Sequence, residues 1–356
     1  MIYLMSFALV VAFLGFAPPR YGLQRNNYKN YIWICGALML FVTAFRTPYT
    51  GSGDTYAYVY NYRYLQSFPT FREYYDRFME GYDLMSSEAG YYYLMWQLGH
   101  IFKNGQTAIM VSSLLITVST CVFIFRNSKD IPLSLTIYVC LGLFTFNMNG
   151  MRQAMAMSIC LFAYELAKGK KTVPFILTVL LAMLFHKTAL CFFPVYFLPR
   201  LKNNLGSWVF YILGLIVCLL FVDQIIAGYY ELSGEDYSKN AAADGGGLFV
   251  ILLYLGTIVL TLYKIYVVQR PSARVALLAT LAGFTAYLSR YIGSDILERV
   301  SYYYFYFPVL LIPEVFQELD DEEYKTIKIF FVLGAVLLFV YRVWNSGFRR
   351  YTFYFM

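Results

Sequence analysis

Long apolar runs follow one another along the chain, separated by short segments that carry most of its charges. A helix needs about 20 mostly apolar residues to cross the hydrocarbon core of a bilayer. Candidate spans lie at residues 2–17, 31–45, 107–125, 131–147, 152–167, 172–185, 188–199, 207–222, 248–269, 275–292, 298–316 and 327–343. The pattern predicts an all-α polytopic membrane protein with about twelve transmembrane helices. We expect a single integral membrane domain over residues 1–356.

The basic residues of the short connections predict which side each connection faces, because lysine and arginine favour the cytoplasmic side. The connection PRYGLQRNNYKN after the first run and the KGKK cluster at 168–171 both fall inside if the spans alternate. Two large loops, at about 46–106 and 223–247, then lie outside. This alternation of inner and outer connections requires residues 91–102, YYYLMWQLGHIF, to form a re-entrant or interfacial helix that does not cross the membrane. The first run lacks a basic leader and a cleavage site, so we expect it to be retained.

Residues 172–199 allow two interpretations, because His186 stands in the middle of an apolar stretch. They could form one long helix, or two short helices that meet on the outer side. A helix of about 14 residues covers about 21 Å, whereas the hydrocarbon core is about 30 Å thick. Two short helices would therefore place His186 in a site sunk into the membrane. The lysines that follow favour this broken arrangement.

Composition agrees with a membrane protein and excludes several kinds of site. Hydrophobic residues make up 60% of the chain, charged residues 14%, and the mean hydropathy is +0.54. The net charge of +7 comes from the loops and offers no basic soluble face for nucleic acid. The six cysteines lie singly in apolar runs, which predicts neither a disulfide framework nor a metal site. With only two histidines in the chain, we expect no histidine metal cluster and no cofactor.

Four cationic or titratable residues lie in or beside apolar stretches: Arg152, His186, Arg290 and Arg299. An ionisable group at membrane depth costs roughly 2.5 to 3.5 kcal/mol on insertion scales, so it usually marks a functional site. A guanidinium pairs bidentately with phosphate oxygens, and several together would hold a diphosphate. The alternative is that each arginine pairs with a carboxylate or caps a helix. It applies above all to Arg299, which directly follows Glu298.

Carboxylates on the same outer side are candidates for proton transfer. Asp54 lies in GSGDTYAY, where glycines let the backbone turn and expose its side chain at the start of the first large loop. It could act as a general base, or it could bond its own backbone as turn aspartates do. His186 is another base candidate, or a hydrogen-bond donor to a phosphate, or only a packing residue. The tyrosines of these loops suit sugar stacking, but for most of the 36 a membrane-interface position is the simpler interpretation.

These motifs together resemble a known family. They are Arg46 followed by GSGDTYAY, the Arg152–Gln153 element in NMNGMRQAMAMS, the Phe185–His186 pair in LFHKTAL, and SRYIGSDILERVSYYYFYF. Over nearly its whole length the chain is similar to the EpsG group of Wzy-type exopolysaccharide and O-antigen polymerases. The commoner family form of the first motif is glycine, threonine, aspartate, tyrosine. Here the order is Gly53, Asp54, Thr55, Tyr56.

The resemblance implies a GT-C-like glycosyltransferase that joins undecaprenyl-diphosphate-linked oligosaccharide repeat units on the outer face of the bacterial cytoplasmic membrane, without a metal or a nucleotide sugar. It implies membrane lipid, a chain-length regulator and a flippase as partners. Asp54 and His186, with Glu88 as a third candidate, would be catalytic. Substrate binding would fall to Arg46, Tyr56, Arg152, Gln153, Arg290 and Arg299.

Two alternatives remain open at this point. An O-antigen ligase, or another glycosyltransferase acting on lipid-linked sugars, would use the same residues with a different acceptor. A transporter or flippase of an anionic lipid-linked sugar would also contain interrupted helices and buried arginines. The chain shows no duplicated half, and its ionisable residues fall on one side, which favours an enzyme.

Overall fold

The computed structural model describes residues 28–51, 54–78, 88–233, 248–291 and 295–356, together with Leu4, Phe7, Ala8 and Val11. Within these residues the chain is helical and contains no strand, so the all-α prediction is confirmed there. An isolated backbone bridge joins Arg46 to Phe353. Most of the first predicted span, and parts of both large predicted loops, lie outside the described residues.

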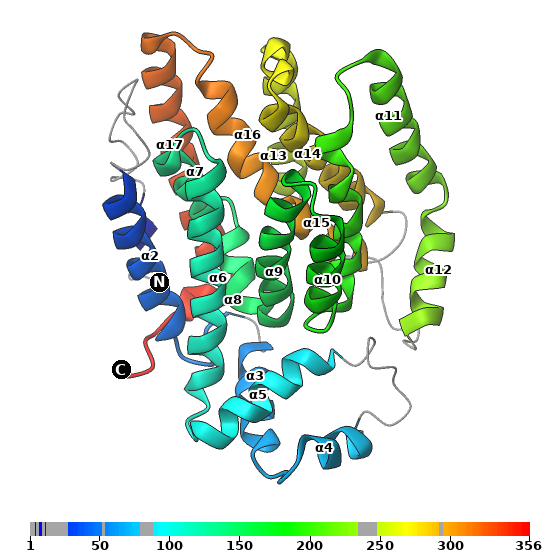
Figure 1. The fold of residues 1–356 in the computed structure, drawn as a ribbon. Helices are drawn as coiled ribbons and strands as arrows, with labels where there is room; N and C mark the ends of the chain where they lie inside the picture. The colour runs from blue at the N-terminus through cyan, green and yellow to red at the C-terminus, as the bar shows by residue number, and fades with distance from the viewer. Residues whose placement is uncertain are drawn as a thin grey trace.

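The main body is a bundle of helices that run roughly along one direction (Figure 1). Its elements are α2 (Lys29–Ala44), α6 (Gln106–Asn127), α7 (Ile131–Cys140), α8 (Leu143–Asn149), α9 (Met151–Lys168), α10 (Thr172–Met183), η2 (Lys187–Tyr196), η3 (Leu198–Arg200), α11 (Leu205–Leu220), α12 (Val222–Ser233), α13 (Leu248–Tyr263), η5 (Ile265–Gln269), α14 (Pro271–Ser289), α15 (Asp295–Tyr304), α16 (Tyr306–Phe316) and α17 (Asp321–Trp344). A last 3₁₀ turn, η6, covers Gly347–Arg350.

Three of the described helices, α6, α14 and α17, are long and apolar enough to cross a membrane by themselves, and the bent pair α7 and α8 would make a fourth span. Five further apolar helices have between 10 and 17 residues. The structure thus agrees with a polytopic membrane protein. The number of about twelve crossings stays a prediction.

The structure interrupts several stretches that we expected to be continuous helices, among them 248–269, which is divided at Lys264 into α13 and η5. The predicted span 131–147 is two helices, α7 and α8, bent by 52°. Gly142 stands at the bend with φ +106°, and a Cβ atom there would lie only 1.9 Å from Nη1 of Arg342. The backbone conformation favours glycine, whereas the Arg342 guanidinium is the end of a flexible side chain that could move aside. Likewise, the predicted span 298–316 is divided at Phe305 into α15 and α16.

The predicted span 188–199 forms a 3₁₀ helix, η2, with Pro194 inside it. Proline removes a backbone donor, and its ring clashes with the preceding turn of a regular helix. Upstream, α10 ends at Met183, and His186 is extended, with φ −159° and ψ 121°. Of the two interpretations of residues 172–199, the structure contains the broken arrangement.

A separate layer of three helices, here called the end layer, lies across one end of the bundle (Figure 1). It consists of α3 (Asp54–Leu65), α4 (Phe71–Phe78) and α5 (Ala89–Ile101). The Trp96 indole in α5 donates to the carbonyl of Phe68, between α3 and α4, at 2.9 Å. The stretch 91–102 that we expected to be re-entrant or interfacial falls in α5. Its position relative to a membrane stays a prediction.

The opposite end of the bundle is held by a buried ion pair between α7 and α17. Asp130 caps α7 by accepting a 3.1 Å hydrogen bond from the Leu133 amide, and its other oxygen lies 2.8 Å from Lys328 Nζ. The Tyr324 hydroxyl also donates to that oxygen. Both charged side chains are almost fully buried, at 0% and 5% exposure. Each therefore depends on the other for compensation of its charge.

Replacing Lys328 with methionine should destabilise the protein by about 3 to 5 kcal/mol, because it leaves the Asp130 carboxylate buried without its cation. The double change Asp130→Asn with Lys328→Met should recover part of the loss. Thermal unfolding in detergent measures both. Lys325→Met, at an exposed position of the same helix, is the matched control. Equal melting temperatures for Lys328→Met and Lys325→Met would show that the pair does not hold α7 to α17.

Candidate functional site

Arg152 and Gln153 lie in the first turn of α9, at the end of the bundle that faces the end layer. Arg152 Nη1 lies 2.5 Å from Glu88 Oε2 and donates to the Tyr92 hydroxyl at 3.2 Å. The guanidinium also lies over two aromatic rings, 5.7 Å from the centroid of Tyr58 and 5.8 Å from that of Tyr92. Arg152 thus joins α9 to both α3 and α5, and its acidic partner lies 64 positions away in sequence.

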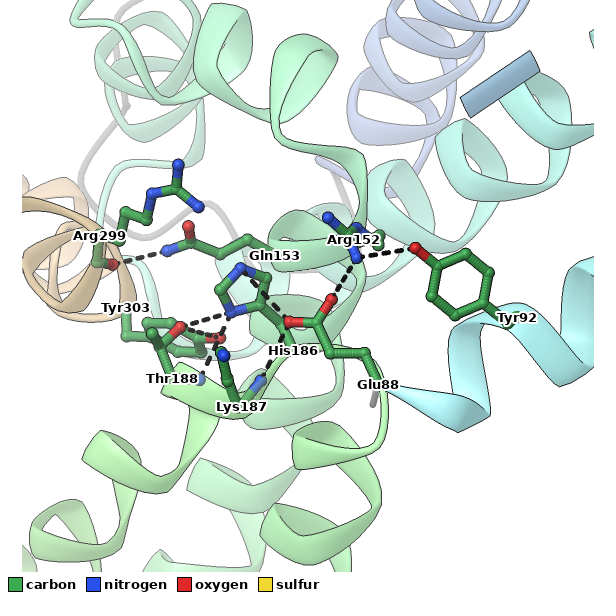
Figure 2. Close-up of polar contacts among 9 residues, drawn as sticks. All are labelled: Glu88, Tyr92, Arg152, Gln153, His186, Lys187, Thr188, Arg299 and Tyr303. Atoms are coloured by element: carbon green, nitrogen blue, oxygen red, sulfur yellow. Dashed lines mark hydrogen bonds and ion pairs between the residues drawn. The ribbon is translucent and has the colours of Figure 1, made fainter. Parts of the chain in front are cut away.

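Glu88 directly precedes α5 in a left-handed conformation, with φ +51° and ψ 37°. Its side chain is only 8% exposed. One carboxylate oxygen meets Arg152, whereas the other lies 3.8 Å from His186 Nε2 and accepts a 3.4 Å bond from the Lys187 amide. Figure 2 shows the carboxylate between the arginine and the histidine. The carboxylate is therefore shared by the two residues that the sequence singled out.

Close backbone packing fixes this position of Glu88. The Tyr91 amide donates to the Leu184 carbonyl at 3.3 Å, which ties the start of α5 to the end of α10. A Cβ atom on Gly90 would lie 2.7 Å from Cβ of Leu184, so only glycine allows the two chains to approach so closely. The break after α10 thus brings Glu88 and His186 together.

His186 is held by a short polar chain behind its ring. Nδ1 accepts a 3.4 Å bond from the Thr188 amide and lies 2.7 Å from the Thr188 hydroxyl, which in turn lies 3.2 Å from the Tyr303 hydroxyl. His186 stands in the turn outside both flanking helices. Burial lowers its pKa well below the usual range, and the positive charges of Arg152 and Arg299 lower it further. A neutral ring that accepts at Nδ1 carries its proton on Nε2, facing Glu88.

The guanidinium of Arg299 lies on the far side of Gln153 from Arg152. The Gln153 amide donates to the backbone carbonyl of Arg299 at 2.6 Å, and this bond ties α15 to α9. Arg299 is exposed, and in Figure 2 no dashed line joins its guanidinium to the other residues drawn. Its charge is close enough to His186 to lower the pKa of the imidazole. Two arginines therefore flank the histidine.

Arg290 belongs to a second cluster. It lies 2.7 Å from Glu298 Oε2 and donates to the Tyr287 hydroxyl at 2.7 Å, while Tyr302 donates to Glu298 at 3.0 Å. Glu298 thus pairs with Arg290, although its neighbour in sequence is Arg299. The predicted gathering of three arginines is therefore divided in the structure: two lie near His186, and Arg290 is paired separately.

Helix geometry explains this division. Residues four apart lie above one another on a helix, whereas neighbours point about 100° apart. Glu298 and Tyr302 therefore form one row of α15, and Arg299 and Tyr303 form the next. The first row meets Arg290 and the second meets the His186 site.

Arg46 is buried in the bundle, at 1% exposure. Its guanidinium donates to the Met148 carbonyl at 2.7 Å and to the Thr43 carbonyl, and Ser113 lies 3.3 Å away. Both carbonyls lie near helix C-termini, where a positive charge is favourable. A small cavity lies beside it, lined by polar side chains such as Asn147 and by apolar ones such as Ile116 and Phe144. The structure thus places Arg46 as a link between α2 and α8, outside the Arg152 cluster.

Asp54 and Tyr56 lie on the exposed face of α3, in its first turn. The Tyr56 ring stacks on Tyr49 with centroids 5.5 Å apart. Burial raises the pKa of Tyr58, the positive charge of Arg152 lowers it, and the charge of Asp54 raises it. Asp54 therefore lies within electrostatic range of the tyrosine that contacts Arg152.

The sequence did not single out four residues of this cluster: Tyr92, Lys187, Thr188 and Tyr303. Two signals could have found three of them. Lys187 and Thr188 directly follow His186, and Tyr303 lies one helical turn after Arg299. Tyr92 carries no such signal, because its approach to Arg152 depends on tertiary packing. In the described part of the chain, no three His, Cys, Asp or Glu side chains gather as a metal site would require.

The fold and the site together define a polytopic membrane protein with a partly buried site of arginine, carboxylate and histidine at one end of its bundle. The family model for the EpsG family matches residues 29–355, and the chain belongs to this family. Membership indicates a function of the exopolysaccharide-polymerase type. Searches of curated proteins and of solved structures gave no match.

Replacing Thr188 with valine should lower polymer production about tenfold and shift its pH profile, because His186 loses the hydroxyl that orients Nδ1. Thr188→Ser should retain most activity. Thr178→Val, which removes an exposed hydroxyl from α10, is the matched control. The pH profile separates an orienting role from a packing role. An unchanged profile for Thr188→Val would contradict this role of the hydroxyl.

Proposed function

We propose that the protein is a metal-independent, GT-C-like glycosyltransferase that polymerises exopolysaccharide. It joins undecaprenyl-diphosphate-linked oligosaccharide repeat units on the outer face of the cytoplasmic membrane. The observation that carries the proposal is the Glu88 carboxylate shared by Arg152 and His186, with Arg299 beside them. These groups supply a proton acceptor and cations for a diphosphate within one site.

The reaction needs both kinds of group. A hydroxyl of the acceptor sugar attacks the anomeric carbon of the donor and forms the new glycosidic bond. The bond from that carbon to the diphosphate oxygen breaks, the lipid diphosphate leaves with the electron pair, and the hydroxyl proton passes to a base. The transition state resembles an oxocarbenium ion, and negative charge builds on the leaving group. Cations that bind this charge more tightly as it grows lower the barrier.

Glu88 is the base that the geometry supports best. It is an acceptor for Arg152 and faces His186 Nε2. When Glu88 takes the proton it loses its negative charge, at the moment when the diphosphate gains one. Arg152 can then turn from the carboxylate to the leaving group, while Arg299 stabilises it from the other side of Gln153. His186 orients Glu88, and Asp54 is a second base candidate at the edge of the site.

Replacing Arg152 with alanine should reduce polymer at least about 100-fold, because removal of one donor to a developing anion typically costs that much. Arg152→Lys should rescue poorly, since a point charge does not reproduce a planar fork. Immunoblots of membrane fractions and polymer size analysis measure both. Arg72→Ala, which removes an exposed arginine of the end layer, should leave the amount and size of the polymer unchanged. Polymer of normal amount from Arg152→Ala would exclude Arg152 from the site.

The purified protein in detergent should extend a defined lipid-linked repeat with no nucleotide sugar present, and EDTA should have no effect. Glu88→Gln should lose this activity, because the amide cannot accept the proton, while the protein still purifies as a folded species. Gel analysis of the lipid-linked products measures extension. A preparation that moves the repeat between vesicle leaflets without extending it would instead identify a transporter.

A further inference from the structure

The outward face of α3 differs in composition from the outward face of the bundle helix α11. Its exposed residues are Asp54, Tyr56, Ala57, Tyr60, Arg63 and Tyr64. None of them is a large aliphatic residue. By contrast, α11 exposes a continuous aliphatic and aromatic surface, including Leu205, Phe210 and Leu213, which is what a lipid-facing helix requires.

Three tyrosines form a row along this face of α3, because they are spaced four residues apart. Tyr56, Tyr60 and Tyr64 are 48%, 58% and 37% exposed. The rings of Tyr60 and Tyr64 are nearly parallel, at 6°. Tyr49, at 75% exposure, continues the row beyond the start of α3 by stacking on Tyr56. We call these four residues the tyrosine row.

The tyrosine row begins next to the candidate site and leads away from it. At the start of α3, the Thr55 hydroxyl donates to the Met148 carbonyl at the end of α8. Near the end of α3, Tyr62 donates to the Phe102 carbonyl, in the turn between α5 and α6. Tyr58, between these two points, lies against Arg152. Figure 1 shows α3 running from the bundle into the end layer.

We propose that the tyrosine row binds the glycan part of the growing product and guides it away from the site. This inference rests on the proposed function. Sugar rings present apolar C–H faces and many hydroxyls, which match an aromatic face with phenolic, carboxylate and guanidinium groups around it. The hydrocarbon core of a membrane, or an apolar protein surface, would instead require aliphatic residues on this face. Tyr58, which lies over Arg152, is on the opposite side of α3 from the row, but the start of α3 meets the end of α8 directly before the first turn of α9 that carries Arg152. The row therefore begins close to the place where a chain extended at Arg152 would leave the site.

The test is the length of the polymer made by a double variant, Tyr60→Ala with Tyr64→Ala. We expect the first joining of two repeats to continue, whereas long chains become several-fold shorter because the product dissociates sooner. The double phenylalanine variant keeps the rings and should make chains close to normal length. Tyr263→Ala, at a 76% exposed tyrosine at the end of α13, is the control. Circular dichroism in detergent checks that each variant is folded.

Direct binding gives a second measurement. Purified polymer, released from cells that express the wild-type chain, should bind the double alanine variant at least about tenfold more weakly than wild type, or about 1.4 kcal/mol. Wild-type chain length and wild-type binding by the alanine variant would overturn the proposal. If wild-type protein joins no repeats at all, the proposed function fails. If it joins them and the row has no effect, only this inference fails.

Discussion

A guanidinium that is largely removed from water needs acceptors to offset its lost hydration, and for Arg152 the Glu88 carboxylate is that acceptor where α9 meets the end layer. The pair joins segments that are far apart in the chain, so the site exists only when α5 is seated against the ends of α9 and α10. His186 then depends on the same carboxylate. The Arg152–Glu88 ion pair thus both attaches the end layer to the bundle and assembles the site.

The two ends of the bundle use buried charge differently. At one end, Asp130 and Lys328 are almost completely enclosed, and helix capping and a tyrosine hydroxyl satisfy the carboxylate further. At the other end, Arg152 keeps 31% of its side chain exposed, and Arg299 is exposed. An enclosed pair can only stabilise the fold, whereas a pair open on one side can exchange partners with an arriving anion. This difference in exposure distinguishes the Asp130–Lys328 pair, which holds helices together, from the Arg152–Glu88 pair, which a ligand could reach.

Much of the helical pattern could be predicted from sequence, because a helix that crosses a membrane needs a long and nearly continuous run of apolar residues. The breaks were harder to predict. At Gly142 the bend goes with a left-handed backbone conformation inside an apolar run, and a single glycine in such a run does not by itself predict a break. The importance of Arg152 and His186 followed from the cost of charge in apolar surroundings, but their common partner did not. Glu88 lies in a polar segment of the sequence, where a carboxylate is usually exposed to solvent. Only the packing of α5 on α10 buries it between Arg152 and His186.

The sequence also could not show which arginines act together. Arg290 and Arg299 bracket one turn and suggested a single cluster, yet adjacent positions on α15 point in different directions. One row of this helix holds Glu298 for Arg290, and the next holds Tyr303 against Thr188. Because α15 carries residues of both clusters on one helix, it couples their positions mechanically. A rotation of α15 that opened one cluster would therefore also move the residues of the other.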